Sequence, residues 1–320
     1  MPADPSAIPA GQPALAAALP RFKIALPVAA LAAMFGIIFW IRPAILSYFG
    51  IGLLLDLAMP AVFASMAQMC VIAINDIDLG IGPFISLTSC IAATLLVRAP
   101  AAGLLALTAA IGAYALMGGL IHVRRLPSIV VTLGASFIWL GCALLLLPSP
   151  GGGAPSLIAG FVNLSPPLVP LPILVLAGAA LLGHLLLMRT ARGAVLRGIG
   201  GNAKAVEQAG WSLARGRMLL YGIAGACGVI AGLLLDGINT SGDATVGAQY
   251  TLTSIAAVIV GGGEFVGGDV SPVGTVTGTL IMLLTGSVLS FVNISTSWQL
   301  SVEGGILIVV LGLRALARTA

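Results

Sequence analysis

Charged residues are scarce in this sequence. They make up 8% of its 320 residues, whereas 59% are hydrophobic and the mean hydropathy is +1.14. An average soluble domain carries about 25% charged residues, and a chain with far fewer could not cover its surface in water. The shortage therefore excludes a water-soluble fold. It predicts an all-α membrane protein whose chain crosses the bilayer several times.

Residues that bind metals, phosphates or redox partners are also few. The two histidines, His122 and His184, lie far apart, and the only lysines, Lys23 and Lys204, do not follow the G-x-x-x-x-G-K-[ST] pattern of a P-loop. The 4 cysteines lie in apolar runs and form no C-x-x-C pair, which is typical of small buried side chains. No Ser/His/Asp or Cys/His arrangement is apparent. We predict no metal, no cofactor in this chain and no enzymatic activity.

Apolar sequence is what the chain has in abundance. A membrane-spanning helix needs about 20 mostly apolar residues. Residues 1–20, rich in Ala and Pro, are expected to form a disordered cytoplasmic tail, and 21–320 a single transmembrane domain. The ten predicted spans are 24–41, 52–74, 83–98, 101–121, 128–147, 168–188, 218–236, 250–262, 272–292 and 298–314.

Lys and Arg predict the orientation of these spans. With a cytoplasmic N-terminus, twelve of the 14 basic residues fall on the cytoplasmic side, and Arg42 and Arg98 fall outside. Both termini are then cytoplasmic. The net charge of +4 does not indicate a nucleic-acid partner, because the bases are scattered among the loops. Asp56, Asp236 and Glu303 fall near outer ends, where each either reaches water or contacts an extracytoplasmic binding protein.

Glycine is common for a helical chain, with 42 residues. In a bilayer, small residues four positions apart allow helices to approach closely. Gly228 and Gly232 have this spacing, and so do Gly274 and Gly278. The spacing predicts a closely packed bundle and nothing more specific.

Two segments interrupt the apolar runs, at 75–83 and at 261–272. An ionised Asp at the bilayer centre costs about 2.5–3.5 kcal/mol on insertion scales, so these segments should lie within protein or beside a wet cavity. Either Asp76 or Asp78 caps the next helix in an ordinary turn, or the segment is part of a gate. We hypothesise that the two breaks meet near the cytoplasmic mouth of a pathway. The candidate pathway or gate residues are Asn75, Asp76, Asp78, Gly80, Gly82, Gly262, Gly263, Gly267 and Gly268.

The longest basic loop is 189–217, on the predicted cytoplasmic side. Within it, "NAKAVEQAG" is typical of a short helix that Asn202 caps and Gly210 ends in a left-handed turn. Such a helix is either a solvated connector or a docking element for a partner protein. Spacing alone does not separate these interpretations.

Four stretches, in order, carry a family resemblance. The loop pattern T-x-x-G-x-x-x-x-x-x-G-G-N-x-x-A-x-x-x-x-G, from Thr190 to Gly210, resembles permease subunits of ribose/xylose-type ABC sugar importers. "IDLGIGPFISL", "SIVVTLGASFIWLGCALLL" and "IAAVIVGGGEFVGGDVSPVGTVTG" resemble other segments of that family. The resemblance runs from about residue 45 to the C-terminus. Asn75 and Asp76 stand where the family usually has glycines, and Gly80 stands for a Ser, which leaves the substrate open.

The resemblance implies a function and a set of partners. This chain would be the permease subunit that imports a monosaccharide or related polyol across the bacterial inner membrane. A separate subunit would bind ATP and Mg²⁺, a periplasmic or lipid-anchored protein would deliver the solute, and a second permease chain, identical or homologous, would complete the pathway in the lipid. The coupling residues implied in loop 193–211 are Gly193, Gly200, Gly201, Asn202, Ala205, Glu207 and Gly210.

Two alternatives stay open. One is an ion-coupled secondary transporter of a small polar solute, although acids in the middle of spans, which such carriers typically use, are nearly absent. The other is an ABC permease for nucleosides or branched-chain amino acids. In relatives of that kind the segment before the third span usually differs from I-D-L-x-x-G.

Overall fold

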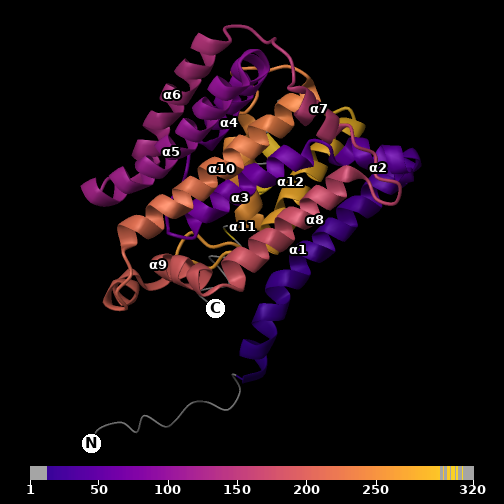
Figure 1. The fold of residues 1–320 in the computed structure, drawn as a ribbon. Coiled ribbons are helices and arrows are strands. Elements are labelled where there is room, and N and C mark those ends of the chain that lie inside the picture. The colour runs from indigo at the N-terminus through magenta and orange to yellow at the C-terminus, as the bar shows by residue number, and fades with distance from the viewer. Residues whose placement is uncertain are drawn as a thin grey trace, which may run out of the picture.

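A computed structural model describes residues 13–295 and, further on, 298, 301–302, 304–306, 308 and 312, with side chains described from residue 27. Figure 1 shows a bundle of helices, and the described residues form no strand, although Gly151 and Gly242 make one isolated antiparallel bridge. The elements are α1 (Pro13–Ile41), η1 (Pro43–Leu46), α2 (Tyr48–Leu55), α3 (Ala58–Ile72), α4 (Ile81–Ile91), η2 (Ala92–Leu96), α5 (Pro100–Arg124), α6 (Ser128–Leu146), α7 (Ser156–Val162), α8 (Leu171–Gly183), η3 (His184–Met188), α9 (Ala191–Gln208), α10 (Leu213–Asn239), α11 (Gln249–Val260) and α12 (Pro272–Phe291).

Six helical stretches are long and apolar enough to cross a membrane. They are Tyr48–Ile72, Pro100–Arg124, Ser128–Leu146, Leu171–Met188, Leu213–Asn239 and Pro272–Phe291, and three shorter apolar helices cover Pro27–Ile41, Ile81–Leu96 and Gln249–Val260. A multi-pass, all-helical chain is therefore confirmed. The count of ten spans stays a prediction, because most of the tenth, 298–314, and Glu303 lie outside the described residues. Helix α1 begins within the predicted tail 1–20, of which 1–12 are not described.

Helices α3 and α10 occupy the middle of the bundle. Every residue of α3 except Phe63 is buried, and α10 packs along both α3 and α5. Outer helices instead expose large apolar side chains, such as Leu105 on α5 (70% exposed) and Leu145 on α6 (85%). Large exposed apolar surfaces of this kind are rare in proteins that face water, and they are expected where a helix faces lipid.

The predicted close packing through glycine is confirmed at both motifs. A Cβ atom added to Gly232 on α10 would lie 2.0 Å from the Thr88 hydroxyl oxygen of α4. One added to Gly278 on α12 would lie 2.0 Å from the Ala257 carbonyl oxygen of α11. Any side chain at these positions would push the paired helices apart.

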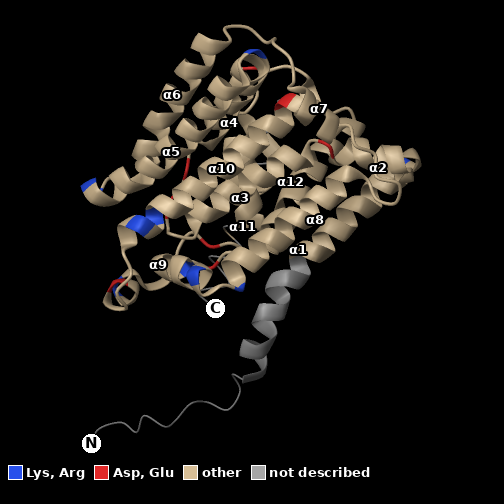
Figure 2. Ribbon diagram, viewed as in Figure 1, with Lys and Arg blue, Asp and Glu red and all other residues tan. Residues whose placement is uncertain are grey.

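The two ends of the bundle differ in charge. Figure 2 shows Lys and Arg gathered around α9 and the start of α10, which we call the α9 end. Of the described bases, only Arg42 and Arg98 lie at the opposite end, beside α2 and at the start of α5. This distribution agrees with the predicted asymmetry. The side of the membrane that each end faces stays a prediction.

Candidate functional site

A short helix, residues 203–208, projects from the α9 end, and we call it the exposed helix. It is set off from the first half of α9 by a kink at Asn202, whose backbone (φ −152°, ψ 83°) leaves the helical region. The Asn202 side-chain oxygen accepts a hydrogen bond from the Ala205 amide at 3.0 Å, and Gly210 ends the segment with φ +85°. Ala205 and Glu207 lie exposed between these two ends. The predicted cap and left-handed end are therefore both confirmed.

The first half of α9 is fixed to the bundle. The Thr190 hydroxyl accepts from the Gly193 amide at 2.9 Å, which caps the helix start. A Cβ on Gly193 would lie 2.4 Å from the Leu187 carbonyl oxygen, so the chain can turn here only with glycine. The Arg197 side chain also donates to that carbonyl, at 3.2 Å. The exposed helix thus extends from a rigid base.

Asn75 connects the two predicted breaks to this base. Its side-chain nitrogen donates to the Gly200 carbonyl at 2.7 Å, and its side-chain oxygen accepts from the Gly267 amide at 3.0 Å. Asn75 itself has φ +62°, a left-handed conformation that Asn tolerates better than most residues. We call the contact of residues 73–75, 197–201 and 267–268 the Asn75 junction.

Glycine lets the three backbones of the Asn75 junction touch. A Cβ on Gly200 would lie 2.3 Å from the Ala73 carbonyl oxygen. Gly268 has φ +70°, and a Cβ there would lie 2.2 Å from the Arg197 carbonyl oxygen. The hypothesis that the two breaks meet is thus confirmed for Asn75 and Gly267, and Gly268 contacts the α9 loop beside them; a pathway mouth at this place stays a prediction. The two breaks meet on the loop that holds the exposed helix, a third partner that the hypothesis did not include.

The other four candidate glycines have different neighbours. A Cβ on Gly80 would lie 3.0 Å from the Thr132 carbonyl oxygen of α6, and one on Gly82 would lie 2.3 Å from the Thr251 hydroxyl oxygen of α11. Gly262 (φ +102°) and Gly263 end helix α11, through amide hydrogen bonds to the carbonyls of Ile259 and Val258. The first break runs from the α9 end into the interior of the bundle, where Gly80 and Gly82 are buried, and a pathway or gate role for these four glycines stays a prediction.

Asp76 forms an ion pair with Arg217 of α10. The Arg217 guanidinium donates to a carboxylate oxygen at 2.8 Å, and the Tyr221 hydroxyl donates to the same oxygen at 3.2 Å. Burial raises the pKa of Asp76, while the charge of Arg217 and the Tyr221 hydrogen bond act in the opposite direction. The pair joins the first break to α10, the helix that follows the basic loop.

Asp78 lies deeper and is fully buried. One carboxylate oxygen accepts from the Gly80 amide at 2.7 Å, and the other accepts from the Tyr114 hydroxyl of α5. The Gln68 amide, oriented by its partners, donates to the Asp78 carbonyl at 3.0 Å and accepts from its amide at 3.2 Å. Asp78 therefore closes a turn just before α4 and is anchored on α3 and α5. The N-cap of α4 is Gly80, which has no side-chain cap, so the capping interpretation is wrong in its strict form.

Helix α6 holds the backbone of the same break. The Thr132 hydroxyl accepts from the Leu79 amide at 3.0 Å, and the Ser128 hydroxyl accepts from the Ile77 amide at 3.3 Å. Both residues lie in the "SIVVTLG" stretch, for which sequence reasoning offered no role. Their four-residue spacing at the start of an apolar helix is the signal that could have found them.

Asp236 and Asp56, near the end of the bundle opposite α9, differ in how far they are buried. Asp236 was expected to reach water or a partner, but it is fully buried on α10 and neither carboxylate oxygen has a hydrogen-bond partner among the described residues. Asp56, at the turn between α2 and α3, is only partly exposed.

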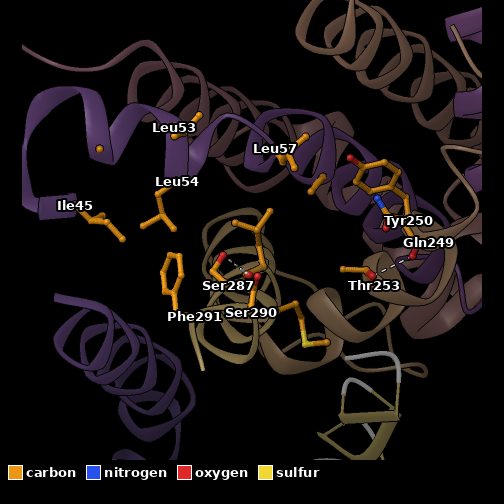
Figure 3. A pocket seen from close by; sticks show the side chains of 15 residues that line it. Ile45, Leu53, Leu54, Leu57, Gln249, Tyr250, Thr253, Ser287, Ser290 and Phe291 are labelled. Atoms are coloured by element: carbon orange, nitrogen blue, oxygen red, sulfur yellow. Dashed lines mark hydrogen bonds between the residues drawn. The ribbon is translucent and has the colours of Figure 1, made fainter. Parts of the chain in front are cut away.

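A cavity of about 600 Å³ lies between η1, α2, the start of α3, α11 and α12. Figure 3 shows Gln249, Tyr250 and Thr253 at one end of it, and Leu54 and Phe291 at the other. Between them, Ser287 and Ser290 project from α12 (Figure 3). Sequence reasoning missed this site. The only signal is a polar residue on successive turns of two apolar helices, which also fits ordinary buried hydroxyls.

Comparison with known proteins gives one family. The family described as "Branched-chain amino acid transport system / permease component" matches residues 50–311, which are most of the chain. No solved structure matches this chain.

Several curated relatives are also similar. The ribose import permease protein of Escherichia coli K12 is 26% identical over 258 residues, which cover 76% of this chain and 78% of the relative. The autoinducer 2 import system permease protein of Yersinia enterocolitica is 29% identical, covering 75% and 76%. The xylose transport system permease protein of Haemophilus influenzae is 35% identical over 140 residues, but these are 44% of this chain and 37% of that relative.

Proposed function

Because the chain belongs to the family of branched-chain amino acid transport system permease components, we propose that it is the membrane-spanning subunit of an ATP-driven importer. It translocates a monosaccharide or related polyol across a bacterial inner membrane. The relatives named for ribose and xylose support this solute class over the amino acids in the family's description. A separate subunit hydrolyses ATP, a binding protein delivers the solute and a second permease chain completes the pathway.

The observation that carries the proposal is the exposed helix 203–208 on its rigid base. It lies at the basic end of the bundle, and the usual bias of Lys and Arg toward the cytoplasm supports a cytoplasmic position for that end. Ala205 presents little side-chain bulk and Glu207 one charge, so a groove on the ATPase subunit can enclose the helix. Asn202 and Gly210 fix its two ends, and Gly193, Gly200 and Gly201 fix its base.

The Asn75 junction supplies a route for movement. A displacement of the exposed helix moves Gly200 and Gly201, which contact the end of α3 and the loop before α12. Helices packed at native density transmit such a shift instead of absorbing it. In this proposal the break around Asp76 and Asp78 opens and closes as α3 and α12 move, while α6 holds its backbone. ATP binding and hydrolysis on the partner drive the cycle.

The first test is recovery of partners from the native membrane in mild detergent. A P-loop ATPase and a solute-binding protein should co-purify with the chain. Glu207→Arg reverses the charge on the exposed helix and should lower the recovered ATPase about tenfold, whereas Arg98→Glu, a charge reversal at the opposite end, should not. Recovery of the chain alone in repeated trials, with uptake driven by an ion gradient, would refute the proposal.

A further inference from the structure

The cavity in Figure 3 has walls of two kinds, and neither carries charge. Among the described residues that line it there is no Asp, Glu, Lys, Arg or His. Gln249 and Thr253 of α11 and Ser287 and Ser290 of α12 supply amide and hydroxyl groups, while Leu54 and Phe291 supply apolar surface. The volume of about 600 Å³ is within the range of small-molecule sites.

This chemistry separates the candidate solutes. An amino acid enters as a zwitterion, and burying its ammonium and carboxylate without charged partners is costly. A sugar carries no charge, and each of its hydroxyls both donates and accepts. The Ser287 hydroxyl donates to the Leu283 carbonyl at 3.1 Å, yet its oxygen can still accept from a ligand hydroxyl. Phe291 and Leu54 suit the apolar C–H face of a sugar ring.

The position of the cavity connects it to the coupling machinery. Three of its walls are α3, α11 and α12, which all run from the cavity to the α9 end. Helix α3 leads to Ala73 and Asn75. Helix α11 leads to Gly261, and α12 starts after Gly268 and Ser271, so all three meet at or beside the Asn75 junction.

Two of these walls are also locked together. A Cβ on Gly274 would lie 2.0 Å from the Gly261 carbonyl oxygen, and the same approach recurs at Gly278 and Ala257. Because side chains packed this closely transmit strain, we expect the two helices to move together. A change in the width of the cavity therefore requires α11 and α12 to move together relative to α3, and it changes the Asn75 junction at their far ends.

We propose that this cavity binds an uncharged polyhydroxylated solute, such as a monosaccharide, and that its occupancy is communicated to the exposed helix through α3, α11 and α12. The proposal rests on the proposed function, which it extends by naming where the solute binds and which solutes are rejected.

The test uses the purified complex of permease and ATPase without the binding protein. Ser287→Cys places a thiol in the cavity, and mass spectrometry follows its alkylation by N-ethylmaleimide. At about 100 mM, D-ribose, D-xylose, D-glucose or myo-inositol should slow that alkylation two-fold or more. When the solute fills half of the cavities, only the other half of the thiols can react, which halves the rate. L-leucine should not slow it. Thr108→Cys, on the exposed face of α5, is the control and should be alkylated at one rate throughout.

Uptake by the complete importer in liposomes is measured in parallel. Thr253→Val removes a hydroxyl that donates to the carbonyl four residues earlier, and Thr108→Val removes one with the same geometry outside the cavity. Loss of one ligand hydrogen bond corresponds to about a five- to tenfold change. Uptake of the sugar should fall by that factor in Thr253→Val and Ser287→Ala, and not in Thr108→Val.

The outcomes are distinguishable. Sugar uptake by the native importer, with no protection of Ser287→Cys and no effect of either cavity substitution, overturns the cavity proposal and leaves the proposed function standing. A Ser287→Cys thiol that does not react also overturns it, because the cavity is then closed to solutes. Protection by leucine instead of sugars, together with leucine uptake, overturns both the solute class and the proposed function.

Discussion

Asn75 offers the sharpest test of the junction, because its substitutions separate hydrogen bonding from backbone strain. Asn75→Gly removes the hydrogen bonds to Gly200 and Gly267 but accepts φ +62° without strain. Asn75→Ala removes the same bonds and adds the cost of a left-handed backbone. Asn75→Asp keeps an acceptor for the Gly267 amide and sets a negative oxygen against the Gly200 carbonyl.

The magnitudes follow from the contacts. A neutral hydrogen bond contributes about 0.5–1.5 kcal/mol, and Asn75 is exposed, so the groups left behind can reach water and the lower half of that range applies. Two bonds give about 1–2 kcal/mol for Asn75→Gly. The left-handed conformation adds about 1–2 kcal/mol for Asn75→Ala. The Asp variant should lie near the Gly variant in stability and differ from it in coupling.

Two assays read these effects. Thermal unfolding of the purified chain in detergent should give midpoints in the order native, then Asn75→Gly, then Asn75→Ala. In the assembled importer, solute transported per ATP hydrolysed should fall for all three variants, since the junction joins the exposed helix to α3 and α12. Native midpoints and native coupling in both Asn75→Gly and Asn75→Ala would show that the junction carries neither stability nor movement, and the reasoning would fail.

Three further substitutions test other contacts. Gly278→Leu places a side chain against a carbonyl oxygen of α11 and should lower detergent stability by several degrees, whereas Gly134→Leu, with open space beside its Cα, should not; equal melting would count against close packing. Asp76→Asn leaves Arg217 without its charged partner and should cost about 1–3 kcal/mol, between exposed and buried pairs; Arg217→Gln on that background should cost little more, and full additivity in a double-mutant cycle would contradict the pair. Gly201→Pro should uncouple ATP hydrolysis from uptake while the chain still reaches the membrane at native yield, and normal uptake would exclude a role for the loop base.

Local features of this chain could be read from the sequence because they depend on neighbours a few residues away. The Asn202 cap, the left-handed Gly210 and the helix break after Ile74 are of this kind. The glycine spacing at 228 and 232 also predicted close packing, although the partner helix was unknown. The limits of the spans could be predicted from hydropathy alone, because the thickness of the bilayer sets how many consecutive apolar residues a spanning helix needs.

Pairings across long stretches of chain could not be read in the same way. Asp76 meets Arg217 across 141 positions, and Asn75 meets Gly267 across 192. Nothing in either local pattern specifies the other. Asp236 shows the opposite error: its place near a span end suggested water, but it is fully buried within the bundle. The cavity was missed because a Ser or Thr that lines it has the same sequence context as one that hydrogen-bonds only to its own helix.

The exposed helix has one more consequence, for the choice of partner. Only Ala203 and Val206 on it are partly buried, and its ends are set by Asn202 and Gly210. In the proposed importer, the remaining outward residues would contact the ATPase subunit and not the bundle. Substitutions on that surface are therefore expected to leave the fold of the membrane domain unchanged. A chain of this design can change ATPase through a handful of substitutions, and a graft of residues 203–209 from a related permease should transfer the choice of ATPase without altering which solute is carried.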